Sequence, residues 1–184
     1  NWSSGVSWSH TQDTEGWPYG LAMGDLDGDE QAELAMGSDL GFLWVVDTET
    51  PETYVGRDIT FDEAEWYMDI GAKTSGGQVE NVWGLTFGQF DEDEATEVAV
   101  GSKQGWVAIF DGETEELQWK YDMDGSSGAD SLCYGLISAD LDGDEIDELV
   151  VAQQNKLTVF VDGDRDVRIE DTSVKNGYGL ANED

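Results

Sequence analysis

A 29-residue unit occurs three times in this chain without an internal insertion or deletion. The copies are residues 19–47, 83–111 and 134–162. Each copy opens with an aromatic residue followed by Gly and Leu, and each carries a glutamate at the same later position: Glu33, Glu97 and Glu148. The spacers between the copies differ in length, while the unit itself does not. A fixed internal length with variable spacers is typical of a repeat architecture.

Within each copy, three short runs are rich in β-branched or aromatic residues and are bounded by Gly, Asp, Asn and Ser, which predicts strands. The expected strands are residues 20–24, 34–36 and 42–46, then 84–87, 98–100 and 106–110, then 135–138, 149–152 and 157–161. A fourth strand is expected in each spacer, at residues 64–69, 117–122 and 167–172. We find no helical periodicity of useful length. Four short antiparallel strands per repeat predict an all-β chain, a β-propeller of four-stranded blades rather than a sandwich.

The expected organisation is three blades with partial blades at both ends. Residues 6–9 match the fourth-strand pattern, and residues 178–184 match the start of a copy. Because typical propellers have about four to eight blades, we expect these residues to belong to a longer propeller. The alternative is a short protomer completed by association with others. The divisions are 1–18 (outer strand of a preceding blade), 19–82 (blade with a long insertion around residues 54–61), 83–133 (second blade), 134–177 (third blade) and 178–184 (start of the next).

An acidic loop follows the first strand of each copy. Loop one (residues 25–33) reads DLDGDEQAE and loop three (residues 140–148) reads DLDGDEIDE, which places carboxylates at loop positions 1, 3, 5 and 9. Calcium takes six to eight oxygen ligands, and these carboxylates with the backbone carbonyl at position 7 and water would fill that shell. The expected ligands are Asp25, Asp27, Asp29, Gln31 and Glu33 in loop one, and Asp140, Asp142, Asp144, Ile146 and Glu148 in loop three.

Loop two (residues 89–97) reads QFDEDEATE and departs from this pattern. Its first position is an amide and Glu replaces Gly at position 4, so that three carboxylates remain and weaker binding is expected. The candidate ligands are Gln89, Asp91, Asp93, Ala95 and Glu97. None of the three loops is an EF-hand, because a strand follows directly and the glutamate expected at position 12 is absent.

The charge balance is extreme, with 42 acidic against 8 basic residues and a formal net charge of −34. Such a chain repels nucleic acid backbones, which excludes a nucleic-acid partner. It also indicates adaptation to concentrated salt, where counterions screen the repulsion, and we expect a haloarchaeal source. The alternative source is an ordinary organism that secretes an acidic calcium binder. Salt adaptation alone does not explain acidic runs that recur at a fixed offset in three units, so we expect Ca²⁺ that pins the blade loops.

The loops in this setting resemble the FG-GAP repeats of integrin α-subunit propellers and the related VCBS repeats of microbial surface proteins. The resemblance rests on the aromatic-Gly start, the DLDGD run and the apolar strand after the glutamate, over the three 29-residue units. It implies a β-propeller with calcium in blade loops and an extracellular role in adhesion or recognition. One departure is at loop position 6, where the family usually has Gly and this chain has Glu30, Glu94 and Glu145. If that position requires a positive φ, a glutamate there is strained, or the loop winds differently.

Two function classes follow. The first is a non-catalytic extracellular or cell-surface module for adhesion, recognition or assembly, with a protein or glycan partner. The second is a propeller enzyme, such as a calcium-containing polysaccharide lyase, with its active site outside these blades. With one His and 8 basic residues, no base and cationic stabiliser converge in the sequence, so we assign no catalytic residue and expect no enzyme. No apolar run is long enough to span a membrane. Tryptophans at strand positions are expected to pack between blades, and the lone Cys133 is expected to be buried and inert.

Overall fold

The computed structural model describes residues 16–26, 29–46, 64, 66–74, 81–93, 95–123, 132–153, 156–161 and 166–171, with side chains placed except at residues 72, 74 and 166–171. Some sequence expectations lie outside these residues. They are the partial blades at residues 6–9 and 178–184, the insertion around residues 54–61, and the side chains of Asp27 and Glu94.

The described chain is all-β apart from one short helix, and its strands form three open four-stranded antiparallel sheets. The first sheet contains β1 (Pro18–Gly24), β2 (Glu33–Ser38), β3 (Phe42–Val46) and β4 (Trp66–Asp69). The second contains β5 (Val82–Gly88), β6 (Glu97–Ser102), β7 (Trp106–Phe110) and β8 (Leu117–Asp122). The third contains β9 (Cys133–Ala139), β10 (Glu148–Gln153), β11 (Leu157–Val161) and β12 (Asp166–Asp171).

Strands pair in chain order within every sheet, and the register between the first and second strands is the same in all three. The leucine two residues after each opening aromatic residue shows this, because it faces the equivalent residue of the second strand each time. The pairs are Leu21 with Met36, Leu85 with Val100, and Leu136 with Val151. The second and third strands pair in one register in the first two sheets, where Leu34 pairs with Val46 and Val98 with Phe110. In the third sheet this register is shifted by one residue, so that Leu149 pairs with Phe160.

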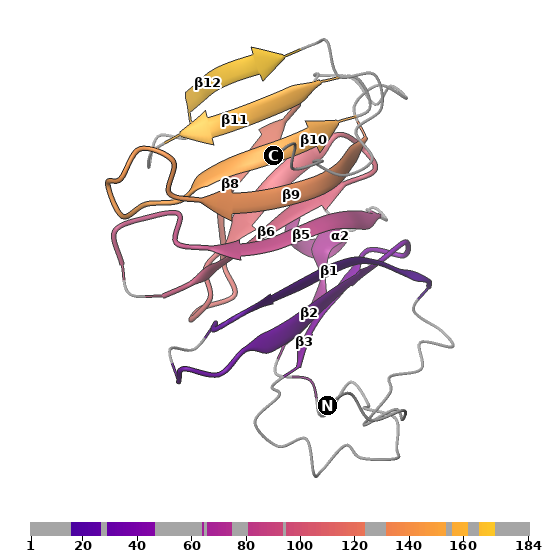
Figure 1. Ribbon diagram of the computed structural model, residues 1–184. Helices are drawn as coiled ribbons and strands as arrows, with labels where there is room; N and C mark the ends of the chain where they lie inside the picture. Colours follow the sequence, from indigo (N-terminus) through magenta and orange to yellow (C-terminus); the bar gives the residue numbers. More distant parts are fainter. Residues whose placement is uncertain are drawn as a thin grey trace, which may run out of the picture.

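The sheets stack face to face, and their first strands β1, β5 and β9 lie side by side (Figure 1). Two apolar cores fill the spaces between them. One joins the first and second sheets, through residues such as Val45, Trp66, Leu85 and Val100. The other joins the second and third sheets, through residues such as Ile109, Cys133 and Leu149. β6 and β10 are buried along their whole length, which explains why their sequences are apolar on both faces.

The sequence predicted all twelve strands in their places, and the predicted limits of β3, β7, β8 and β11 are confirmed. Most other strands extend one or two residues further, because residues such as Glu33 and Ser38 continue the ladder although they are polar. The sequence did not predict α2 (Ile70–Thr74), a single turn after β4. The side chain of Ile70 is buried, and its N–H donates a 2.9 Å hydrogen bond to Gly41 O. Tertiary contact rather than helical periodicity therefore fixes this turn.

Cys133 is a buried free thiol, as expected from its apolar surroundings. Trp66 and Trp106 are buried in the core between the first and second sheets, as expected, whereas Trp44 is buried in a separate cluster with Met36 and Val46 of the first sheet. Trp119 is partly buried against the second core and contacts the ring of Phe160 at a centroid distance of 5.0 Å. Trp83 lies between the rings of Tyr19 and Tyr134, at centroid distances of 5.5 and 5.3 Å. These five side chains therefore serve packing.

Candidate metal-binding loops

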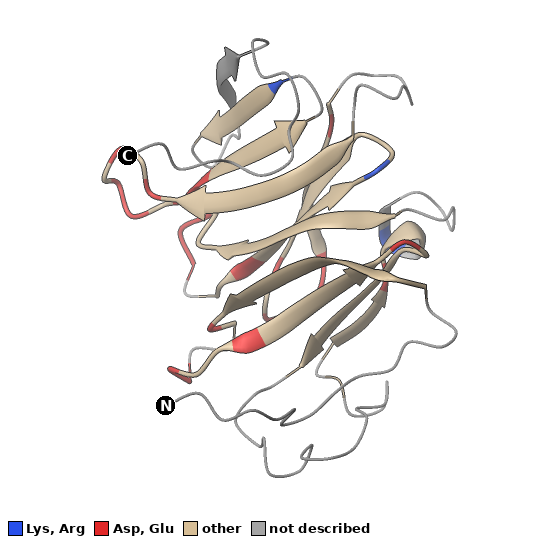
Figure 2. Ribbon diagram, turned by 45° about the vertical axis from the view of Figure 1, so that its right-hand side comes forward, with Lys and Arg blue, Asp and Glu red and all other residues tan. Residues whose placement is uncertain are grey.

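The three acidic loops connect the first and second strands of their sheets, and they lie along the same edge of the stack (Figure 2). This placement follows from the repeat, because each loop begins at the end of the first strand and finishes where the second strand starts. Acidic residues of all three loops therefore lie along this edge. The geometry of each loop is set by three recurring groups of contacts.

The first is a buried glutamate at loop position 9, at the start of β2, β6 and β10. Glu33, Glu97 and Glu148 are almost completely buried. In each case Oε2 accepts a hydrogen bond from the backbone N–H at loop position 2. The donors are Leu26 at 2.5 Å, Phe90 at 2.6 Å and Leu141 at 2.7 Å. The glutamate thus ties the two ends of the loop together, a role that the sequence reasoning, which assigned it only to a metal, did not identify.

The second is a backbone turn held by the aspartate at position 5, which accepts the N–H of position 7 in all three loops. The distances are 2.7 Å from Gln31 to Asp29, 2.8 Å from Ala95 to Asp93 and 3.0 Å from Ile146 to Asp144. This two-residue link is an Asx turn, and it explains the recurrence of Asp at position 5 without any metal. Asp93 is the one of the three that also belongs to a group of converging carboxylates.

The third group of contacts consists of hydrogen bonds to the aspartate at loop position 1. Asp25 accepts the N–H of Glu30 at 2.9 Å, and Asp140 accepts that of Glu145 at 3.2 Å. Asp140 also accepts a 2.6 Å bond from the N–H of Gly143, and this bond is the main reason that the pKa of Asp140 lies below its usual range. Position 1 therefore organises the turn through backbone donors in loops one and three.

Loop position 6 adopts a positive φ in both loops where it is described. Glu30 has φ 71° and Glu145 has φ 76°, which is the left-handed region that favours Gly. A glutamate at this position is therefore strained, because its backbone has the left-handed conformation that glycine adopts without strain. The hydrogen bonds from Glu30 and Glu145 to the position 1 aspartates hold that conformation.

Loop two uses amide donors where the others have a carboxylate. The Gln89 side chain donates to the backbone oxygens of Asp91 at 3.1 Å and Asp93 at 2.5 Å. From β8, the Gln118 amide donates to Asp91 Oδ2 at 2.9 Å and to Asp111 Oδ2 at 3.2 Å. Amide N–H groups therefore neutralise part of the negative potential in this loop.

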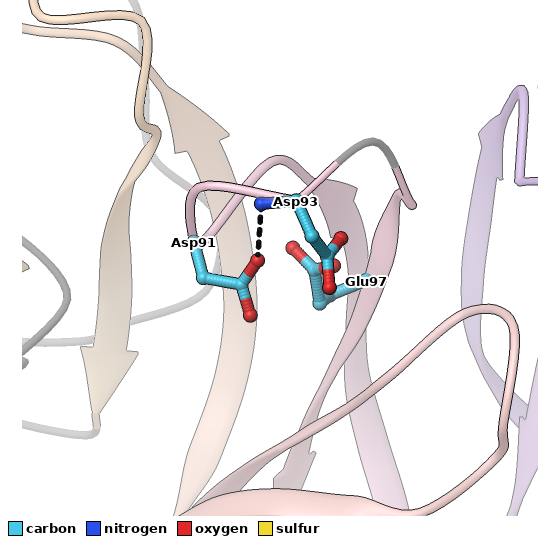
Figure 3. Close-up of side chains that lie close together, drawn as sticks. All are labelled: Asp91, Asp93 and Glu97. Atoms are coloured by element: carbon cyan, nitrogen blue, oxygen red, sulfur yellow. Dashed lines mark hydrogen bonds between the residues drawn. The ribbon is translucent and has the colours of Figure 1, made fainter.

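Carboxylates converge in two of the loops, with their oxygens all within 4.8 Å of one another. One group is Asp91, Asp93 and Glu97 (Figure 3), and the other is Asp140, Asp142 and Glu148. Oxygens bound to one Ca²⁺ at about 2.3–2.6 Å are separated by no more than about 5 Å, so both groups have the size of a calcium shell. Among the other carboxylates of the described residues, Asp144 lies outside these groups, as do Asp25, Asp29 and Glu33 of loop one, whose position 3, Asp27, is not described. The remaining candidates, Gln31, Gln89, Ala95 and Ile146, have no side-chain carboxylate and stay predictions.

The Glu97 carboxylate is buried, and only one of its two oxygens has a hydrogen-bond partner among the described residues. Its Oε1 atom is buried and has no hydrogen-bond partner among the described residues. The pKa of Glu97 is raised to about 7, mainly by burial; the hydrogen bond from Phe90 lowers the pKa, and the nearby Asp91, Asp93 and Asp111 add to the rise. A buried charge of this kind is costly unless it is paired, and a cation or a proton must balance it. The residues of this loop therefore fit a hard divalent cation.

Comparison with known proteins finds similar folds but no similar sequence. No family model and no curated protein matches the sequence. The structure resembles that of Sqt1 from Saccharomyces cerevisiae, with a TM-score of 0.60 and 14% identity over 90% of this chain. It also resembles the computationally designed protein Ika4, with a TM-score of 0.58 and 13% identity over 95% of this chain. The chain spans 38% of Sqt1 and 83% of Ika4. Among the described residues, no helix has the length and apolar character needed to cross a membrane.

Proposed function

We propose that the three sheets are blades of a calcium-binding β-propeller module that acts outside the cell or at its surface, without catalysis. The support for the propeller is the repeated four-stranded meander, with first strands side by side and apolar faces packed against each other. A propeller places first strands innermost and repeats this packing around a ring. The FG-GAP and VCBS repeats that the sequence resembles have the same expected arrangement.

The single observation that carries the calcium proposal is the convergence at Asp91, Asp93 and Glu97, together with the buried and unpartnered Oε1 of Glu97. Three carboxylates within 4.8 Å repel one another unless a cation or protons balance them. Calcium suits such a loop better than magnesium, because Mg²⁺ demands near-ideal octahedral geometry and retains its water. The ligands that we assign in loop three are Asp140, Asp142 and Glu148.

The proposed role of the cation is structural. Each loop joins the first two strands of a blade, and its glutamate is already anchored to the backbone of loop position 2. A cation bound to the same carboxylates would fix both strand ends at once. A protein or glycan at the surface of a cell is the proposed partner, and a haloarchaeal setting agrees with the net charge of −34.

Thermal unfolding in concentrated KCl tests the calcium proposal. A ligand of the folded state stabilises it by RT ln(1 + [L]/Kd), about 2.7 kcal/mol when its concentration is about a hundred times Kd. We expect the midpoint to fall when a chelator is added, to recover with Ca²⁺ and not to recover with an equal concentration of Mg²⁺. No change on chelation would overturn the proposal and leave the acidic loops as adaptation to salt.

Two variants of loop two sharpen this test. Asp91→Asn removes a converging carboxylate, so the shift produced by Ca²⁺ should shrink. Glu92→Gln is the matched control, since it removes one charge from the same loop at a residue outside the converging group. Equal loss of the calcium shift in both variants would indicate a general effect of charge rather than a site.

A further inference from the structure

Loop two is joined to the third sheet by a reciprocal pair of hydrogen bonds between two residues. The backbone N–H of Gln89, at loop position 1, donates to Asp147 Oδ2 at 3.1 Å. The backbone N–H of Asp147 donates in return to Gln89 O at 2.6 Å. Asp147 is position 8 of loop three and directly precedes β10. Both polar groups of the Gln89 backbone are therefore held by one residue of the neighbouring sheet.

Close packing surrounds this pair of bonds, at the place where β5 and β9 lie side by side (Figure 1). Phe90 is 2% exposed and belongs to the core between the second and third sheets. A Cβ added at Gly88 would lie 2.7 Å from Phe90 Cζ, 2.7 Å from Ser138 Cβ and 2.9 Å from Asp147 Oδ2. A segment packed this closely cannot shift without its neighbours. The start of loop two is therefore fixed on the third sheet.

The segment that the third sheet holds is bonded to all three converging carboxylate residues of loop two (Figure 3). The side-chain amide of Gln89 donates to the backbone oxygens of Asp91 and Asp93. The backbone N–H of Phe90 donates to Glu97 Oε2. Gln89 thus bonds to the third sheet through its backbone and to its own loop through its side chain. The position of the three carboxylates therefore depends on the contact between the sheets.

An aspartate at loop position 8 is present in loop three only, since the equivalent residues are Ala32 in loop one and Thr96 in loop two. Loop two is also the one loop with a neutral amide at position 1. A hydrogen bond that a carboxylate accepts is stronger than one between neutral groups. The N–H of Gln89 and the carboxylate of Asp147 thus form an anchor that belongs to this pair of loops.

We propose that Asp147 is a positioning residue for the cation site of loop two, so that the site is assembled from two sheets. Asp147 lies outside the converging group and is not a ligand in this proposal. It orders the segment of Gln89 and Phe90 before a cation arrives, and an ordered loop loses less conformational entropy on binding. The inference rests on the proposed function and deepens it, because it identifies what prepares the site for Ca²⁺.

Thermodynamic linkage makes this effect reciprocal. If the contact with the third sheet strengthens calcium binding in loop two, bound Ca²⁺ must strengthen that contact by the same factor. The N–H of Asp147 reports the contact directly, because it is the donor to Gln89 O. Its exchange with solvent deuterium should therefore slow when loop two binds calcium.

Calcium titration followed by NMR tests the proposal on the full chain in concentrated KCl. The amide signals of Asp93 and Ala95 report loop two by itself, since their N–H groups donate to Asp91 and Asp93 inside that loop. We expect Asp147→Ala, which removes the acceptor, to raise the dissociation constant of loop two at least about fivefold. Asp147→Asn is the matched control. It removes the same charge and keeps an oxygen for the Gln89 N–H, so the constant should stay within about twofold of that of the unaltered chain.

A second measurement needs no change to the third sheet. In the unaltered protein, saturating Ca²⁺ should slow the exchange of the Asp147 N–H at least about fivefold. Asp91→Asn, which alters loop two alone, should reduce this effect. The N–H of Lys103 donates to Asn81 O at the opposite end of the second sheet and is the internal reference, so the slowing at Asp147 should exceed that at Lys103. This comparison decides the matter if Asp147→Ala does not fold.

The outcomes separate this inference from the calcium proposal. Equal dissociation constants for Asp147→Ala and Asp147→Asn would overturn the role of Asp147 and leave the calcium site of loop two in place. Slowing of the Asp147 N–H that Asp91→Asn leaves unchanged would do the same. If Ca²⁺ shifts neither the Asp93 nor the Ala95 signal of the unaltered chain, the proposed calcium site is wrong, and this inference falls with it.

Discussion

The backbone N–H of Phe90 donates a 2.6 Å hydrogen bond to Oε2 of Glu97, which holds a carboxylate in the interior beside two aspartates. The other oxygen of Glu97 is buried without a hydrogen-bond partner among the described residues. Glu97 can therefore have a structural role and a ligand role at the same time. The glutamate closes the loop with one oxygen and leaves the other oxygen for a cation or a proton.

The first prediction concerns pH in the calcium-free protein. Burial raises the pKa of Glu97 to about 7 from an ordinary value of 4.5, so the folded state holds this proton more tightly than the unfolded state does. The contribution of Glu97 to stability is therefore greatest below about pH 4.5 and is lost as pH rises to about 7. The loss amounts to at most about 3 kcal/mol, since one pKa unit corresponds to about 1.4 kcal/mol.

Urea unfolding at several pH values, in chelator and concentrated KCl, measures this effect. Glu97→Gln keeps an oxygen for the Phe90 N–H and cannot titrate, so the difference between the two proteins isolates the one carboxyl group. We expect the unaltered protein to lose stability relative to the variant as pH rises. Parallel pH profiles would show that folding does not shift the pKa of Glu97. Saturating Ca²⁺ should reduce the slope, because the ion favours the ionised form.

The second prediction concerns the left-handed residues of the loops. Glu30 and Glu145 have φ 71° and 76°, and a non-glycine residue in this region costs on the order of 1 kcal/mol. Glu30→Gly and Glu145→Gly should each stabilise the fold by about 0.5–1 kcal/mol, after the greater freedom of glycine in the unfolded chain is taken into account. Glu30→Gln is the control, since it removes the charge and retains the strain. If the Gln variant gains as much as the Gly variant, charge repulsion rather than backbone strain is the cause.

The third prediction tests the close approach of the sheets. A Cβ added at Gly24 would lie 2.7 Å from Cδ2 of Phe87 and 2.9 Å from its Cβ, so Gly24→Ala should destabilise the fold by about 1–3 kcal/mol. Gly135→Ala is the matched change, because the nearest atom to its Cβ would lie at 3.9 Å. It should alter the stability of the monomer by less than about 0.5 kcal/mol. Urea unfolding of dilute protein compares them, and a similar cost for both would contradict the packing between β1 and β5.

The fourth prediction concerns Gln89, whose amide bonds to two backbone oxygens of loop two. Gln89→Asp restores the carboxylate found at position 1 of the other loops and removes both donors. In chelator the variant should lose about 1–2 kcal/mol of stability, through the lost bonds and the added repulsion. In Ca²⁺ it should bind the ion about ten times more tightly, since an anionic ligand replaces a neutral one. Isothermal titration calorimetry measures the affinity, and an unchanged value would place Gln89 outside the coordination shell.

Much of the fold could be predicted from the sequence because strand patterns and turn residues are local. Alternating or wholly apolar runs bounded by Gly and Asp predicted β3, β7 and β11 with their observed limits. The turn α2 could not be found in this way. Its position depends on Ile70, which is buried and bonded to Gly41 across the sheet. Sequence spacing carries no signal of that contact.

The candidate site was predictable in its residues and less so in its contacts. Spacing alone brought Asp91, Asp93 and Glu97 into one loop as the retained carboxylates, and the structure places their oxygens together. The bond from Phe90 to Glu97 was not foreseen. Glu97 is the first residue of its strand, and an alternating sequence pattern does not show whether such a residue is buried. Its burial depends on the neighbouring sheet.

The sequence by itself determined the repeat, the four-stranded unit and the acidic character of each loop, since these follow from local periodicity and residue type. The tertiary structure alone decided which residues at equivalent positions of the three units are buried and which are exposed to solvent. Leu21, Leu85 and Leu136 occupy the same place in their units, yet only the last two are buried. The reason is physical: a side chain in a strand points to a face, and whether that face meets water or another sheet depends on the stacking of units distant in the chain.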